Sequence, residues 1–256
     1  DALVTISDRS SSLVTVSNID MTSTAHANAF QPQISYNNGN AAANTNWWMD
    51  FDFVFVNKGT TVPVSVNSFN LTAIDVDGDG SRLHEYVAFL SPNSYLLESN
   101  TLLSVQDVLL NILNILTAGK QFDGPVTNFA NIDVTATQVM TTVNYINKSS
   151  FRLRAGGGTI GGSSSVADRM YSFWFKGFDY NVPVQVTLPI KLSAFNAVLG
   201  NNSKRVDLSW TTAYEKNVSH FIVERSTDGI NYADAGMVFA YGNTTESKNY
   251  SISDNI

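Results

Sequence analysis

Apolar side chains recur at every second position along most of this chain, and this alternation limits the fold more than any other feature of the sequence. Phe51, Phe53 and Phe55 would share one face of a strand, and residues 69–73 repeat the pattern. Neighbouring side chains of a strand point to opposite faces, so a period of two predicts strands with one buried face. Asn and Gly clusters, as at residues 37–40, separate these runs. Many short strands with turns between them predict an all-β fold, a β-sandwich of jelly-roll-like type.

Residues 102–116 depart from this period. Their apolar side chains recur at intervals of three or four, polar side chains share the opposite face, and Gly119 follows where a helix would end. This spacing predicts one amphipathic helix packed against the sandwich. A partner-binding helix is the alternative, but a short apolar stripe in a globular domain is usually core packing. The segment is also too short and too polar to cross a bilayer.

Residues 155–162 are rich in glycine and predict a flexible loop. The segment lacks the Gly-Lys-Ser or Gly-Lys-Thr ending of a phosphate-binding loop. We therefore assign no nucleotide chemistry to it.

The composition excludes several classes of partner. Charged residues make up only 14% of the chain, its net charge is −7, and it contains no cysteine. Nucleic acids and anionic membranes attract clusters of Lys and Arg, and the sequence has none. The absence of cysteine excludes disulfides and thiolate metal sites. Abundant Ser, Thr, Asn and Gly are typical of extracellular β-proteins, so we expect a secreted protein that neither binds nucleic acid nor inserts into a membrane.

A neutral, extended stretch at residues 182–190 contains Pro183 and Pro189. Such a stretch suits a stiff connector between domains. We therefore expect a β-sandwich domain over residues 1–187 and a second domain over residues 188–256.

The second domain carries a specific resemblance. Residues 188–195 (LPIKLSAF), 208–229 (LSWTTAYEKNVSHFIVERSTDG) and 249–255 (NYSISDN) resemble the fibronectin type III-like domain of Bacteroidetes proteins exported by the type IX secretion system. The resemblance implies secretion to the cell surface, with Trp210 as the core aromatic residue. It also implies that Phe221 and Val223 are neighbours of Trp210 across the sheets and that Asp228 and Gly229 form a hairpin turn.

This second domain looks incomplete. A fibronectin-like sandwich needs about seven strands, whereas the sequence predicts about five: near 192–198, 206–212, 220–226, 235–240 and 250–253. We expect the missing strands to come from a continuation of the natural chain beyond residue 256, or from a neighbouring molecule as in a filament.

Residues 69–89 (FNLTAIDVDGDGSRLHEYVAF) are similar to aspartate-rich strand ends in modular bacterial surface proteins, some of them adhesins. Asp75, Asp77 and Asp79 alternate along a turn that contains Gly80, and Glu85 lies near the position of the last ligand of a calcium loop. Carboxylates at alternate positions of a tight turn can converge on Ca²⁺, which prefers oxygen ligands. We predict a Ca²⁺ site of Asp75, Asp77, Asp79 and Glu85. The alternative is a solvated turn, which Asp and Gly also favour.

Nothing in the sequence resembles a catalytic centre. The histidines, at positions 26, 84 and 220, are scattered, and no zinc-protease or serine-hydrolase motif occurs. Acids that converge from distant strands, as in glycoside hydrolases, leave no local motif. Asp50 and Asp52 share the strand face opposite Phe51 and Phe53, so we expect them on a solvent face or near the acidic turn. Exposed tryptophans among Trp47, Trp48 and Trp174 would indicate a carbohydrate-binding module, although core packing is the commoner role.

We therefore expect a non-enzymatic structural or adhesive protein of the cell surface, with a filament subunit as one form of it, whose partners are other copies of itself or surface glycans. The alternatives are a carbohydrate-binding module of a polysaccharide-degrading protein and a secreted hydrolase with dispersed acids. Because one fold serves many functions, the choice depends on the site.

Overall fold

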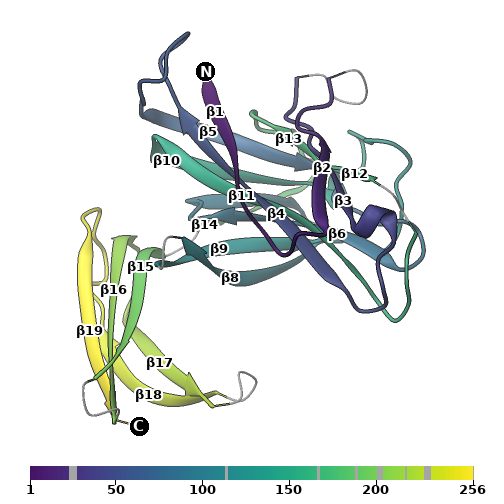
Figure 1. Ribbon diagram of the computed structural model, residues 1–256. Helices are drawn as coiled ribbons and strands as arrows, with labels where there is room; N and C mark the ends of the chain where they lie inside the picture. Colours follow the sequence, from purple (N-terminus) through teal and green to yellow (C-terminus); the bar gives the residue numbers. More distant parts are fainter. Residues whose placement is uncertain are drawn as a thin grey trace. The chain divides into compact units, whose positions relative to one another are not determined.

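The computed structural model describes residues 1–22, 28–112, 115–165, 168–187, 190–200, 204–216, 218–227 and 232–255, with backbone alone for residues 109–112 and 115–116. The chain divides into two compact units, Asp1–Val108 with Lys120–Thr187 and Leu109–Gly119 with Leu188–Ile256. Strands dominate both units (Figure 1), and the paired strands run antiparallel. The helical segments in the described residues are two short 3₁₀ turns, η1 (Asn37–Gly39) and η2 (Thr137–Val139). No helix in these residues is long and apolar enough to span a membrane.

Most of the strands belong to three sheets. The six-stranded sheet has the order β1 (Ala2–Arg9), β4 (Asn46–Phe55), β11 (Ser150–Thr159), β6 (Leu83–Leu90), β9 (Ile115–Asp123) and β8 (Ser104–Ile112). The five-stranded sheet has the order β13 (Ser172–Trp174), β5 (Val66–Ile74), β10 (Thr141–Lys148), β7 (Ser94–Glu98) and β14 (Pro183–Thr187). A three-stranded sheet contains β12 (Asp168–Met170), β3 (Gln33–Tyr36) and β2 (Val14–Asn18).

Aromatic rings join the two larger sheets face to face. Phe69 of β5 lies 5.0 Å from Phe55 of β4 and 5.3 Å from Phe151 of β11, between ring centroids. Tyr95 of β7 meets Phe122 of β9 at 5.2 Å. Each pair takes one ring from each sheet, so the core of the first unit is the layer between them. The prediction of an all-β sandwich is confirmed.

The alternation of β4 produces this arrangement. Phe51 and Phe53 are buried in the core at 0% and 2% exposure. Asp50 and Asp52 point to the opposite face, as the alternation predicts, but Asp50 is only 1% exposed and so does not face solvent. There they form two-pronged ion pairs, Asp50 with Arg154 and Asp52 with Arg152 of the neighbouring β11.

The predicted helix at residues 102–116 is wrong. This segment contains β8 and the start of β9, which are neighbours in the six-stranded sheet. The described side chains at its start alternate as in a strand: Leu103 is buried, whereas Ser104 and Gln106 are exposed. A short apolar run fits either period, and pairing within the sheet outweighs the local helical spacing. Gly119, predicted to end the helix, lies within β9.

The predicted glycine loop at residues 155–162 is also wrong over its first half. Strand β11 continues to Thr159 and pairs with β4 and β6 on either side. A Cβ at Gly156 would lie 2.4 Å from the Tyr86 ring, and one at Gly157 2.7 Å from the Trp47 ring. These glycines therefore serve close packing of large rings against the strand rather than flexibility.

The second unit has two small sheets. One has the order β15 (Ile190–Leu199), β16 (Arg205–Glu215) and β19 (Lys248–Asn255), and the other pairs β17 (His220–Ser226) with β18 (Tyr232–Phe239). These strands overlap the five predicted from the sequence. Trp210 is buried and lies 5.3 Å from Phe221 and 5.5 Å from Tyr250, between ring centroids, which confirms its core position. Asp228 and Gly229 lie outside the described residues.

Candidate functional site

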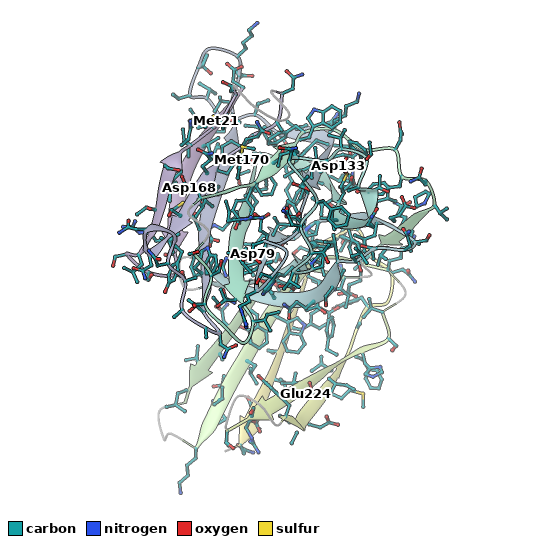
Figure 2. All side chains as sticks on the ribbon, turned by 90° about the vertical axis from the view of Figure 1, so that its right-hand side faces the viewer. Met21, Asp79, Asp133, Asp168, Met170 and Glu224 are labelled. Atoms are coloured by element: carbon teal, nitrogen blue, oxygen red, sulfur yellow. The ribbon has the colours of Figure 1, made fainter. Side chains whose placement is uncertain are left out.

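A cavity of about 430 Å³ in the first unit is lined by three of the four acids that the sequence analysis predicts as calcium ligands. We call it the acidic pocket. Its walls come from the segment after β5, from β6, from β12 and from the loop after β9. It is lined by Asp75, Asp77, Glu85, Asn128, Phe129, Asn131, Ile132, Asp168, Arg169 and Met170. Figure 2 labels Asp168 and Met170 at the two ends of β12, and Asp79, which does not line the cavity.

Arg169 binds two of the acids. Its Nε lies 2.5 Å from Glu85 Oε1, and its terminal nitrogen lies 3.2 Å from Asp77 Oδ1. Asp77 also accepts the backbone N–H of Phe129 at 2.6 Å, through Oδ2. Both carboxylates are 2% exposed. One guanidinium thus holds two buried carboxylates in fixed positions, which charge-assisted hydrogen bonds do well.

Asp75 differs from these two acids. Its residue is 7% exposed, and its Oδ1 is buried without a hydrogen-bond partner. The backbone N–H of Asp133 donates to the same carboxyl group. The backbone of Asp75 has a φ of 64°, in the left-handed region that Asp tolerates better than most residues. An unpaired buried oxygen costs free energy, so this carboxyl group lowers the stability of the unliganded fold.

Burial raises the pKa of all three acids. The pKa of Asp75 rises to about 8 through burial and the nearby charges of Asp77 and Glu85. Burial raises the pKa of Asp77 to about 6 and that of Glu85 to about 7, although Arg169 opposes both shifts. The pKa of Arg169 is itself raised, chiefly by the charge of Glu85. Perturbed acids that share a cavity are typical of functional sites.

Asp79 has a different role. Its Oδ1 accepts the backbone N–H groups of Ser81, Arg82 and Leu83 at 2.8, 2.8 and 3.0 Å. Its Oδ2 accepts the hydroxyl of Ser164 at 2.9 Å. Gly80 supplies the positive φ that the turn needs. Asp79 therefore closes the turn between β5 and β6.

The structure brings together three of the four predicted calcium ligands, Asp75, Asp77 and Glu85, but not Asp79. Arg169 already neutralises part of their charge. Among the described residues, no group of three or more His, Cys, Asp or Glu side chains is arranged to hold a metal ion. The arrangement as it stands fits an ion pair better than a calcium site, and calcium binding stays a prediction.

The three tryptophans do not form an open platform. Trp47 is 2% exposed and stacks on Tyr36 at 5.0 Å between ring centroids. Trp48 is covered by the guanidinium of Arg154, 3.5 Å from the ring centroid. Trp174 packs against Phe178. Core packing and ion contacts thus account for these rings, which weakens the case for tryptophan stacking on sugars.

Sequence reasoning missed the residue that organises the pocket. Arg169 is 84 positions from Glu85 and 92 from Asp77 along the chain, so no local motif links them. The one available signal is general: buried acids need a basic partner. The asparagines of the pocket likewise fit a loop, and nothing in their spacing separates them from ordinary turn residues.

No protein-family model matches this chain, and no curated protein matches its sequence. The case for a function therefore depends on the geometry of the acidic pocket.

Proposed function

We propose that this protein is a non-enzymatic, extracellular adhesive protein that binds a polar ligand, of the class of surface glycans, in the acidic pocket of its first unit. The observation that carries the proposal is the pocket itself. Buried carboxylates, two asparagines and one arginine converge on a cavity large enough for a small organic group.

The chemistry of the lining suits hydroxyl-rich ligands. Carboxylates accept hydrogen bonds from hydroxyl groups, whereas Asn side chains both donate and accept. Phe129, Ile132 and Met170 supply apolar surface for the carbon face of a sugar ring. Because Arg169 fixes Asp77 and Glu85 in the free protein, binding of a ligand costs little conformational entropy of these two side chains.

The same arrangement argues against catalysis. A general acid or base must exchange its proton easily near the working pH. Asp77 and Glu85 are both held by Arg169, which opposes the rise of their pKa values and occupies one oxygen of each carboxyl group that would exchange a proton with a substrate. The described lining contains no Ser, His, Cys or Lys that could act as a nucleophile.

A hydrolase with dispersed acids is the second candidate, because several carboxyl groups with raised pKa values share one cavity. A screen of polysaccharide and ester substrates separates the two functions. We expect no turnover above background. Turnover that Glu85→Gln abolishes in a folded protein would establish the hydrolase instead.

The adhesive function is tested by binding of the purified protein to an array of neutral, acidic and amino glycans, with affinities then measured in solution. The Asn128→Ala variant removes one amide from the pocket and should weaken binding about fivefold, the value of one hydrogen bond. Asp107→Asn, on an exposed side chain that does not line the pocket, is the control and should bind normally. Absence of binding to every glycan, or binding that Asn128→Ala leaves unchanged, would contradict the proposal.

A further inference from the structure

The geometry points to a specific subsite: we propose that the acidic pocket holds a protonated primary amine whose carbon skeleton packs on the apolar part of the lining, with Asp75 Oδ1 as its main acceptor. This inference rests on the proposed function, since it names the ligand chemistry of the same pocket.

The first step is the state of Asp75. Its carboxyl group lines the cavity, is more than nine-tenths buried, and has one oxygen without a partner in the structure. Buried polar atoms in folded proteins are nearly always paired, so an unpaired one at a cavity wall indicates a ligand. An ammonium group has three donors and no acceptor, which complements a bare carboxylate oxygen.

The second step is charge. Four acids line the pocket, Asp75, Asp77, Glu85 and Asp168, against a single basic side chain. Arg169 donates hydrogen bonds to Asp77 and Glu85, and neither a hydrogen bond nor an ion pair joins it to Asp75. Asp168 accepts the hydroxyl of Ser17 at 3.2 Å, which adds no positive charge. A cation is therefore the partner that suits the ionised form of Asp75.

The third step is size and surface. A cavity of about 430 Å³ is far larger than a single bare metal ion needs and falls in the range of small-molecule sites. Phe129, Ile132 and Met170 line the cavity with carbon and sulfur, which are not ligands for Ca²⁺. These groups instead suit the carbon part of an organic amine, and an aromatic ring such as Phe129 also attracts cations. The lining thus favours an amine over a metal ion.

Two sources carry this chemistry, an amino sugar of a glycan and the lysine side chain of a protein. The test measures affinity in solution by calorimetry for D-glucosamine and for Nα-acetyl-lysine amide. N-acetylglucosamine and Nα,Nε-diacetyl-lysine amide are the matched ligands without the charge. The wild-type protein should bind at least one amine about tenfold or more tightly than its acetylated form, because a hydrogen bond between charged groups is lost. The better of the two amines identifies the source.

The variant Asp75→Asn keeps the size of the side chain and removes its charge. It should lower the affinity for the amine about tenfold or more and leave the affinity for the acetylated ligand unchanged, with Asp107→Asn as the control. Near-ultraviolet circular dichroism confirms that the variant is folded. The inference is overturned if the wild type binds the amine and its acetylated form with equal affinity. It is also overturned if Asp75→Asn binds the amine as tightly as the wild type does. If the amine subsite fails in this way but neutral glycans still bind, the proposed function stands. If no ligand binds at all, the amine subsite and the proposed function are both wrong.

Discussion

The two units of this protein bury their apolar side chains to very different extents. The first unit encloses a continuous core that includes Phe51, Phe89, Tyr145 and Phe173, all at 0% exposure or close to it. In the described part of the second unit, the buried apolar side chains are Trp210, Val218 and Tyr250.

The same contrast appears at the surface. In the second unit Phe239 is 78% exposed, Tyr241 68% and Tyr232 60%. An apolar cavity of about 290 Å³ also opens beside Trp210 and is lined by Leu192, Phe195, Phe221 and Val223 among others. Large exposed apolar surface is typical of interaction sites.

The difference teaches where each unit can carry a function. A dense core gives the first unit enough stability to tolerate buried, poorly paired acids, which is the usual setting of a binding pocket. The second unit buries few apolar side chains among its described residues, and its exposed apolar surface suits contact with other molecules. We therefore expect ligand recognition in the first unit and association through the second.

The largest expected effect comes from breaking the ion pairs of the acidic pocket. Arg169→Met leaves Asp77 and Glu85 buried without their partner and should lower the free energy of unfolding of the first unit by about 3–5 kcal/mol. Arg225→Met breaks the more exposed pair with Asp254 in the second unit and should cost about 0–1 kcal/mol. Denaturant unfolding of the full chain measures both. Equal losses of unfolding free energy in the two variants would show that the ion pairs of the two units contribute equally to stability.

The next effect concerns pH. Because the pKa of Asp75 is about 8 in the folded protein and near 3.8 in the unfolded chain, the folded state keeps its proton longer. The stability of the first unit should therefore fall as the pH rises from about 4 to about 8. Asp77 and Glu85, whose pKa values are also raised, act in the same direction.

Asp75→Asn removes the charge and should stabilise the protein by about 1–3 kcal/mol at pH 8, because a neutral amide costs less free energy to bury than an unpaired carboxylate. The gain should shrink towards pH 4. Unfolding curves at both values test this. A variant that is destabilised at pH 8 would mean that the Asp75 carboxylate is well paired in solution.

A smaller effect is expected at the exposed surface of the second unit. Phe239→Ser should change the free energy of unfolding by no more than about 0.5 kcal/mol, because the side chain lies in solvent. It should nevertheless weaken self-association, about tenfold if the ring is buried between copies. Sedimentation at several concentrations measures this. A wild-type protein that stays monomeric at high concentration would exclude the role of other copies as partners.

The smallest effect is that of calcium. A site with an affinity on the order of 10⁻³ M, as in extracellular modules, would stabilise the protein by about 0.6 kcal/mol at roughly 2 mM Ca²⁺. Chelation should lower the melting temperature of the first unit slightly, and Asp77→Asn should remove the difference. An unchanged melting temperature with and without a chelator would end the calcium prediction.

The sequence predicts the strands well where one face is clearly apolar, as in β4 and β5. It fails where tertiary contacts decide. The run that contains Val105 and Ile112 fits a helix as well as a strand, and only pairing within the sheet selects the strand. Gly156 and Gly157 predict a loop from the sequence alone, whereas in the structure they lie in a strand and leave room for the rings of Tyr86 and Trp47.

The candidate site was predictable in part. The spacing of Asp75 and Asp77 marks the segment, and Glu85 follows on the next strand. The basic partner of these acids could not be predicted, because Arg169 reaches them from β12, far along the chain. Asp79 shows the opposite error: its position in the motif suggested a ligand, whereas backbone N–H groups of its turn bond to its Oδ1 and the Ser164 hydroxyl bonds to its Oδ2.

The most direct test of this account is a carbon-13 NMR titration of the Asp75 carboxyl group in the intact protein, with the Asp75→Asn variant used to assign the signal. The account predicts a pKa raised to about 8 in the free protein, because the group is buried and unpaired. It also predicts a lower pKa when D-glucosamine is present, since an ammonium group favours the ionised form. A pKa near 3.8 in the free protein, unchanged by the amine, would contradict the central claim that Asp75 is buried without a partner and binds a cationic ligand.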